Sequence, residues 1–139
     1  MKVDVNTLSS LLSCKANQRN FSVRWETISH AEKLIFAKNS NTPINIMQLL
    51  AIEDSSYIKE AVARNSNTYI ILAKLSYDLS SAVRYGVARN SNTQADILCY
   101  LAKDQISTIR KAVAENLNTQ ANTLHLLAKD KYEEIREAV

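Results

Sequence analysis

A short polar phrase recurs four times at a nearly constant interval, and it restricts the fold more than any other feature of this chain. The phrase is Asn-x-Asn-Thr, and its copies end at Thr42, Thr68, Thr93 and Thr119, which are 26, 25 and 26 residues apart. A fixed period of this length is typical of solenoids and other repeat arrays. Because a unit this short cannot bury its apolar side alone, neighbouring units must stack to form a continuous core.

Two apolar patterns within each unit predict two helices. After each Thr, an apolar pair is followed one turn later by Leu, which is the stripe of an amphipathic helix. These positions are Ile46-Met47/Leu50, Ile71-Leu72/Leu75, Ile97-Leu98/Leu101 and Thr123-Leu124/Leu127. A second, shorter pattern with i, i+4 spacing follows at Ile58/Val62, Val83/Val87, Ile109/Val113 and Ile135/Val139.

The predicted fold class is therefore all-α, an α-solenoid of about four two-helix repeats of roughly 26 residues that begin near residues 37, 63, 88 and 114. The chain has one Gly and one Pro, whereas sandwiches and barrels need many tight turns. That Gly, Gly86, stands in a column with Ala61, Ala112 and Ala138, which predicts a close approach of two helices there.

The polar phrase is interpreted as a structural ladder. Thr42, Thr68, Thr93 and Thr119 are predicted to cap the first helix of each repeat, with Pro43 at the first helical position; Ser55, Ser80 or Ser81, and Ser107 are predicted to start the second helices. Asn39, Asn65, Asn90 and Asn116 form one column and Asn41, Asn67, Asn92 and Asn118 another. Their side chains are predicted to bond local backbone groups and to tolerate left-handed turns.

Both ends of the chain depart from the pattern. Residues 1–36 are predicted to form a diverged N-terminal capping repeat before the array of residues 37–139, because Asn6-Thr7, Leu11-Leu12 and Val23-Arg24 repeat the same offsets. About nine residues around 31–38 are then extra. At the other end the chain stops at Val139 within a repeat, so we expect uncovered apolar residues and self-association through the C-terminal edge.

The full frame is Ile/Val-Arg-x-x-Val-Ala-x-Asn-x-Asn-Thr, followed by x-x-x-Ile-Leu-x-x-Leu-Ala-x-Asp, and residues 109–119 and 101–104 match it best. Over residues 37–139 this frame resembles the leucine-rich repeat variant family of bacterial proteins. The resemblance implies a HEAT-like right-handed superhelix in which a short and a longer helix alternate. One family member carries an iron–sulfur cluster on a cysteine-rich segment, but Cys14 stands alone here, so no cofactor is expected.

Acidic and basic residues recur six positions apart, at Glu53/Lys59, Asp78/Arg84, Asp104/Arg110 and Asp130/Arg136. The architectural interpretation is that each basic side chain bridges the carboxylates of its own repeat and the next. The functional alternative is a phosphate-binding groove, to which Lys38, Arg64 and Arg89 add a second basic column near the end of the shorter helix. Glu115 interrupts this column, and the net charge of +3 is small for a nucleic-acid-binding domain.

No constellation for catalysis or metal binding overlies the repeats. His30 and His125 are far apart, Cys14 and Cys99 lack metal-ligand spacing, and no nucleophile motif or glycine-rich loop is present, so we predict no enzyme and no metal site. Without an apolar run of membrane-span length or a signal core, we expect a cytoplasmic protein that does not contact membranes.

The predicted function is a non-enzymatic binding scaffold whose concave face engages a protein or peptide. Nucleic-acid binding through the basic columns is the alternative. The candidate contact residues are Lys59, Arg64, Arg84, Tyr85, Arg89 and Arg110. The tyrosines occupy non-equivalent repeat positions, so they suit either a specific surface or partial burial between helices; they are Tyr57, Tyr69, Tyr77, Tyr85, Tyr100 and Tyr132.

Overall fold

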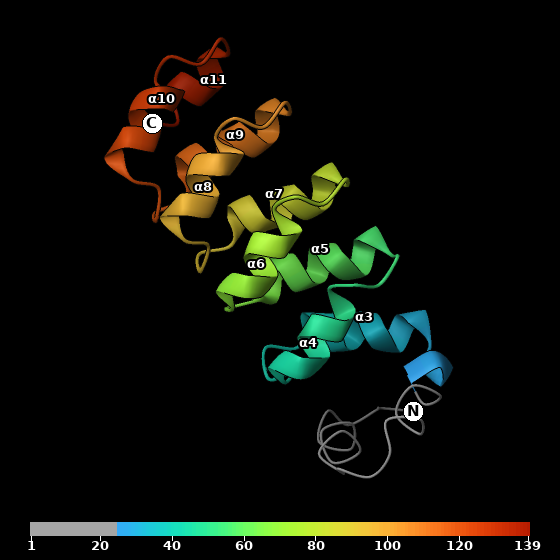
Figure 1. Cartoon of the computed structure of the whole chain (residues 1–139). Helices are drawn as coiled ribbons and strands as arrows, with labels where there is room; N and C mark the ends of the chain where they lie inside the picture. The colour runs from blue at the N-terminus through green and yellow to red at the C-terminus, as the bar shows by residue number, and fades with distance from the viewer. Residues whose placement is uncertain (1–24) are drawn as a thin grey trace.

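The computed structural model describes residues 25–139, and all regular structure in that part of the chain is helical, which confirms the all-α prediction. The helices are α3 (His30–Lys38), α4 (Ile44–Leu50), α5 (Ser56–Asn65), α6 (Tyr69–Leu75), α7 (Ser81–Arg89), α8 (Ala95–Leu101), α9 (Ser107–Glu115), α10 (Ala121–Leu127) and α11 (Glu133–Arg136) (Figure 1). Within these residues no helix has the length and apolar character needed to cross a membrane.

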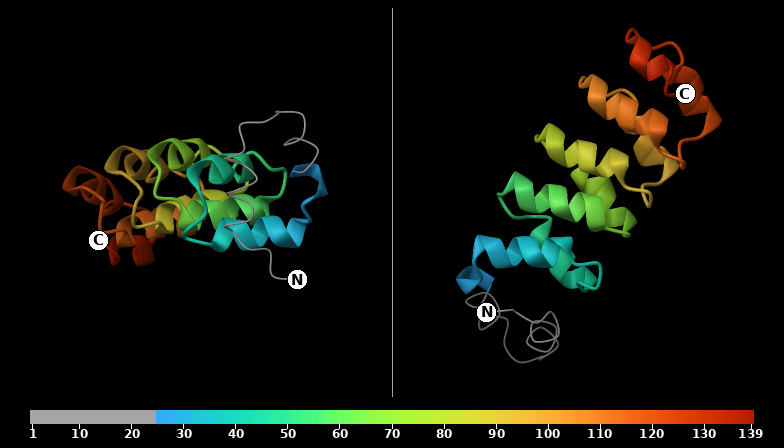
Figure 2. Two further views of the ribbon diagram at one scale, coloured as in Figure 1. Left: turned by 90° about the horizontal axis from the view of Figure 1, so that it is seen from below. Right: turned by 180° about the vertical axis from the view of Figure 1, so that it is seen from behind.

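The helices form two layers. Helices α3, α5, α7, α9 and α11 pack one against the next, and we call them the stacked helices. Helices α4, α6, α8 and α10, the short helices, lie in a second layer and contact mainly the stacked helices before and after them (Figures 1 and 2). Each short helix has 7 residues, whereas α5 has 10 and α3, α7 and α9 have 9 each.

The prediction that the second helix of each repeat is the shorter one is therefore wrong. The second helix begins directly after the acidic loop and continues to the Asn phrase, but only one of its sides is buried. The two apolar residues at i, i+4 lie on that side, and the polar residues of the first and last helical turns are not part of this pattern. Apolar spacing therefore located this helix but underestimated its length.

The core lies between the two layers and contains most of the predicted apolar positions. The largest fully buried side chains are Phe36, Ile46, Leu50, Ile58, Val62, Leu72, Leu75, Leu98, Leu101, Ile109, Leu127 and Ile135. Val139 is an exception, at 47% exposed, because α11 ends at Arg136 and does not carry Val139 into the core. Its predicted equivalence with Val113 is wrong.

The predicted close approach at Gly86 is confirmed. A Cβ atom added to Gly86 on α7 would lie 3.1 Å from the Ala63 Cβ and 3.3 Å from the Glu60 carbonyl oxygen, both on α5. Such distances leave almost no room for a side chain between the two helices. A residue without Cβ therefore lets α5 and α7 pack closely.

The predicted N-capping role of the repeated Thr is wrong, because the hydroxyl groups bond backward. Oγ1 of Thr42, Thr93 and Thr119 donates to the carbonyl of Phe36, Val87 and Val113 at 2.7, 2.6 and 2.6 Å. Each carbonyl belongs to the last turn of the preceding stacked helix. The N-cap positions of α4, α8 and α10 are instead occupied by Pro43, Gln94 and Gln120, so Pro43 stands one position before the predicted one.

Thr68 is the exception among the four threonines. It occupies the N-cap of α6 but its side chain makes no capping bond, and its hydroxyl contacts only the exposed Asn67 amide at 3.4 Å. The Val62 carbonyl, which is equivalent to the three carbonyls that accept a Thr hydroxyl, accepts the Ser66 N–H at 2.8 Å. Thr68 differs in its position, because α6 begins one residue after Thr68, whereas α4, α8 and α10 begin two residues after their Thr.

The predicted starts of the second helices are confirmed in part. Ser55 is the N-cap of α5, and its hydroxyl accepts from the Ile58 N–H at 3.4 Å. Ser80 is the N-cap of α7 without a side-chain bond. Ile106, and not Ser107, is the N-cap of α9.

The N-terminal boundary differs from the prediction. Residues 31–38 are not extra, because they belong to α3, which packs against α5 as α5 packs against α7. Lys33 lies 26 residues before Lys59 and is its repeat equivalent. The predicted boundary between residues 36 and 37 falls inside α3, and the residues assigned to the diverged repeat at Asn6-Thr7, Leu11-Leu12, Cys14 and Val23-Arg24 lie outside the described residues.

Candidate functional site

The first Asn of the second, third and fourth phrases joins neighbouring repeats. The Asn90 side-chain amide donates to the Ala63 and Ser66 carbonyls of the preceding repeat, both at 2.7 Å. Asn65 and Asn116 make equivalent bonds of 2.8 to 3.0 Å to Ala37 and Asn39, and to Ala88 and Asn90. These carbonyls are at or near the C-terminal end of a stacked helix, where no intrahelical donor remains.

The same asparagines also shape their own turns, as predicted. Oδ1 of Asn39, Asn90 and Asn116 accepts the N–H two residues further on, at 2.8 to 3.0 Å. The predicted left-handed backbone is wrong at these three positions, since their φ angles are −87°, −76° and −80°. The structural role therefore comes from the amide group and not from an unusual backbone.

The repeated acidic and basic residues form ion pairs between repeats. Lys59 Nζ lies 2.6 Å from Asp78, and Arg84 Nε and Arg110 Nε lie 2.7 Å from Asp104 and Asp130. At the start of the series Lys33 pairs with Glu53 at 2.8 Å. Each cation thus binds the carboxylate of the following repeat.

The prediction that each cation also bridges the carboxylate of its own repeat is wrong in one detail. Arg84 and Arg110 reach the backbone carbonyls of Asp78 and Asp104, both at 2.8 Å, and not their carboxylates. The carboxylates turn away because each one accepts the N–H two residues later in its loop, as Asp104 does from Ile106 at 2.9 Å. One guanidinium group therefore holds two loops together.

These pairs perturb the titration of their members. The hydrogen bond that Arg110 donates to Asp130 lowers the pKa of Asp130, and the same bond raises the pKa of Arg110. For Asp104, burial raises the pKa, but hydrogen bonds from Arg84 and the Ile106 N–H together outweigh it, so the net pKa is lowered. Side chains of the Arg110–Asp130 pair are only 10% and 9% exposed, and the structure thus engages Lys59, Arg84 and Arg110 internally.

Two members of the second basic column, Arg64 and Arg89, lie on the solvent-exposed side of α5 and α7. Arg64 bonds Glu60 one turn earlier at 2.9 Å, and its guanidinium carbon lies 5.6 Å from the centre of the Tyr85 ring. Arg89, one turn after Tyr85, pairs with Glu115 at 2.9 Å, so the residue that interrupts the basic column is a partner of that column. We call Arg64, Tyr85 and Arg89 the stacked-helix site, and both arginines are about half exposed.

The repeat pattern did not reveal another set of cations, at the C-terminal ends of the short helices. Lys74, Lys103 and Lys129 are exposed, and no carboxylate partner is found for them within residues 25–139. Between them the Tyr77 and Tyr100 rings pack with centroids 4.4 Å apart. Lys103 and Lys129 each immediately precede an acidic residue of the ladder, and Tyr77 holds the same position in its repeat. This shared position could have identified Lys103 and Lys129 from the sequence.

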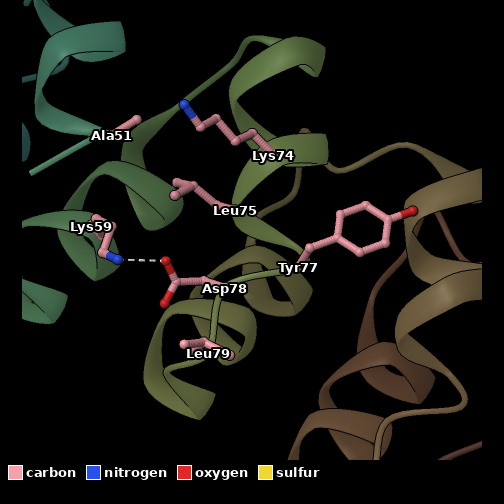
Figure 3. A pocket seen from close by; sticks show the side chains of 7 residues that line it. All are labelled: Ala51, Lys59, Lys74, Leu75, Tyr77, Asp78 and Leu79. Carbon is pink, nitrogen blue, oxygen red and sulfur yellow. Dashed lines mark hydrogen bonds and ion pairs between the residues drawn. The ribbon is translucent and has the colours of Figure 1, made fainter. Parts of the chain in front are cut away.

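A shallow open hollow of about 310 Å³ lies beside these residues. It is lined by Ala51, Lys59, Lys74, Leu75, Tyr77, Asp78 and Leu79. Figure 3 shows the Lys59–Asp78 ion pair beside Leu79, the ammonium group of Lys74 pointing toward Ala51, and the Tyr77 ring pointing away from the pair. The hollow thus combines one neutralised pair with a lysine that has no acidic partner among its lining residues.

No protein-family model matches this chain, and comparisons with curated proteins and with solved structures found no significant match. The leucine-rich repeat variant resemblance therefore stays a prediction.

Proposed function

We propose that this chain is a non-enzymatic binding scaffold, a right-handed α-solenoid of the leucine-rich repeat variant type that engages a protein or peptide in the cytoplasm. Its contact surface is the solvent-exposed side of the stacked helices, centred on Arg64, Tyr85 and Arg89. The observation that carries the proposal is the grouping of the half-exposed Arg64 and Arg89 with the partly buried Tyr85 on two adjacent stacked helices.

The polar residues common to the repeats hold neighbouring repeats together. The amides of Asn65, Asn90 and Asn116 and the cations Lys59, Arg84 and Arg110 bind groups of a neighbouring repeat. Partner recognition in repeat arrays then falls to side chains that differ from one repeat to the next. Tyr85 is such a residue, since Glu60 and Lys111 hold the equivalent positions on α5 and α9.

The packing of the two layers favours the stacked helices as the concave side. The stacked helices contact one another directly, whereas the short helices contact mainly the stacked helices. In a curved array the more closely spaced layer lies on the inner side, because the inner path is shorter. We therefore assign the concave face to α5, α7 and α9, where Tyr and Arg are also the residue types enriched at interface hot spots.

Nucleic-acid binding is less well supported. Phosphate contacts call for unpaired cations. Lys59, Arg84 and Arg110 are instead neutralised in the ladder, and Arg64 and Arg89 face Glu60 and Glu115. Nucleic-acid binding is the alternative that the experiment below tests against protein binding.

The experiment compares the wild-type chain with an Arg64→Ala/Tyr85→Ala/Arg89→Ala variant in affinity capture from lysate of the source organism. A captured protein is identified, purified and titrated against both chains by calorimetry. The matched control, Lys131→Ala/Tyr132→Ala/Arg136→Ala, removes two cations and one tyrosine from the C-terminal repeat, at exposed positions that belong to neither proposed surface. We expect the first variant to weaken binding at least about tenfold and the control to retain it.

Equal weakening by both variants would overturn the assigned surface. A steep loss of affinity for a mixed DNA/RNA fragment between low and high salt, without any purified protein partner, would replace the proposal with nucleic-acid binding.

A further inference from the structure

The ends of the short helices form a second exposed strip whose chemistry differs from that of the stacked-helix site. At the end of each short helix, one N–H donates to the carbonyl three residues earlier, so the same backbone positions can be compared in successive repeats. We call the side chains at these positions the short-helix row. Its members are Leu49 and Ile52, Lys74 and Tyr77, Tyr100 and Lys103, and Leu126 and Lys129.

The row combines apolar and cationic side chains. Ile52, Tyr77, Tyr100 and Leu126 are 59%, 66%, 46% and 44% exposed. Lys74, Lys103 and Lys129 are also exposed. Large apolar side chains grouped on a surface mark interaction sites more often than the same side chains scattered singly.

The positive charge of this row is not neutralised by the acidic ladder beside it. Asp78, Asp104 and Asp130 adjoin the row in sequence, but each is already paired with Lys59, Arg84 or Arg110. The nearest carboxylates are therefore already paired and do not compete with a ligand for Lys74, Lys103 and Lys129. A ligand with its own carboxylates can approach these lysines without displacing an internal ion pair.

We propose that the short-helix row binds an acidic segment of another protein that also carries aliphatic or aromatic side chains. Carboxylates of the segment meet Lys74, Lys103 and Lys129. Its apolar side chains pack on the Tyr77–Tyr100 pair and on Leu126. This is a second surface, on the layer opposite the stacked-helix site, and it does not depend on what that site binds.

An acidic protein segment fits the row better than a single nucleic-acid strand. Ring stacking with bases needs free aromatic faces. Tyr77 and Tyr100 pack against each other with centroids 4.4 Å apart, so each ring already has one face occupied by the other. The remaining apolar members, Ile52 and Leu126, are aliphatic and suit protein side chains.

The test uses a fluorescein-labelled 14-residue peptide in which Glu alternates with Leu and Phe, with binding followed by fluorescence anisotropy at low salt. We expect saturable binding to the wild-type chain and at least about a tenfold loss in Lys74→Glu/Lys103→Glu. The matched control, Lys38→Glu/Lys111→Glu, reverses the same amount of charge on α3 and α9, and we expect less than about a twofold loss. Circular dichroism checks that each variant is folded. Tyr77→Ala/Tyr100→Ala, which leaves the charge unchanged, separates apolar contact from simple attraction, and its expected loss is about fivefold.

Three results would overturn the proposal. They are no binding by the wild-type chain, equal losses in the two charge-reversal variants, and tighter binding of a labelled 14-nucleotide oligo(dT) than of the peptide. The last would assign the row to nucleic acid.

Discussion

Removal of the Asn90 side-chain amide should destabilise the protein far more than removal of another Asn from the same loop. Asn90 is 4% exposed and joins α7 to the end of α5 through two bonds of 2.7 Å. In Asn90→Ala the Ala63 and Ser66 carbonyls lose these donors in an environment that is almost closed to water. The Asn92 N–H also loses its acceptor, but Asn92 is exposed and water can replace it.

The magnitude follows from the two buried carbonyls. A buried polar group without a partner costs about 1–3 kcal/mol. Partial entry of water into the space left by the amide reduces this toward the lower end. We therefore expect Asn90→Ala to lower the free energy of unfolding by about 2–4 kcal/mol, a large fraction of the roughly 5–15 kcal/mol of a typical domain.

The assay is urea unfolding followed by circular dichroism at 222 nm, with Asn92→Ala as the matched control. Asn92 keeps its backbone bond to Asn90 when its side chain is truncated, so its cost should be below about 0.5 kcal/mol. With a urea dependence of about 2 kcal/mol per M, the Asn90→Ala midpoint should fall by about 1–2 M. Midpoints of the two variants that agree within experimental error would refute the assignment of Asn90 as the link between repeats.

Three further outcomes are expected, each read from unfolding midpoints. Thr119→Val loses the 2.6 Å bond to a buried carbonyl and should cost about 1–2 kcal/mol, whereas Thr68→Val should be nearly neutral; equal costs would contradict the capping geometry. Gly86→Ala should destabilise by about 1 kcal/mol, because contact with Ala63 exceeds the gain in helix propensity, and a stabilised variant would show that the helices can separate freely. The folded-state pKa of Asp130 is lowered, so its ion pair stabilises the protein above the unfolded pKa of about 4, and this contribution is lost as the pH falls below that value. Asp130→Asn should therefore lower the melting temperature at pH 7 and reduce the dependence of the melting temperature on pH between about 4 and 2. A dependence on acid pH equal to that of the wild-type chain would count against the pair.

Local patterns in the sequence predicted several features of the structure. The all-helical class and the buried positions at Ile46, Leu75 and Ile109 were predicted correctly, because apolar spacing reports which side of a helix must leave water. Gly86 was also identified, since a single departure from a column of Ala implies a steric requirement at that point. These features need only neighbours a few residues away.

The direction of the Thr119 hydroxyl could not be read from the sequence. A Thr between two helices can cap either one, and Thr119 bonds the carbonyl of the preceding helix although that carbonyl also accepts a backbone N–H. Where the next helix begins one residue earlier, as α6 does after Thr68, the Thr lies at the N-cap position and this bond is absent.

Tertiary structure alone decided which charges remain available. Arg84 is six residues from Asp78 and 20 from Asp104, yet it binds the carboxylate of the latter, because stacking brings consecutive loops side by side. The same stacking engages the conspicuous arginines and leaves Lys74 and Lys103 exposed without an acidic partner among the described residues. Sequence spacing determines which residues share a helix face, but the contacts between repeats depend on how far each unit shifts and turns against the next, and that is set only when the cores of the units pack together.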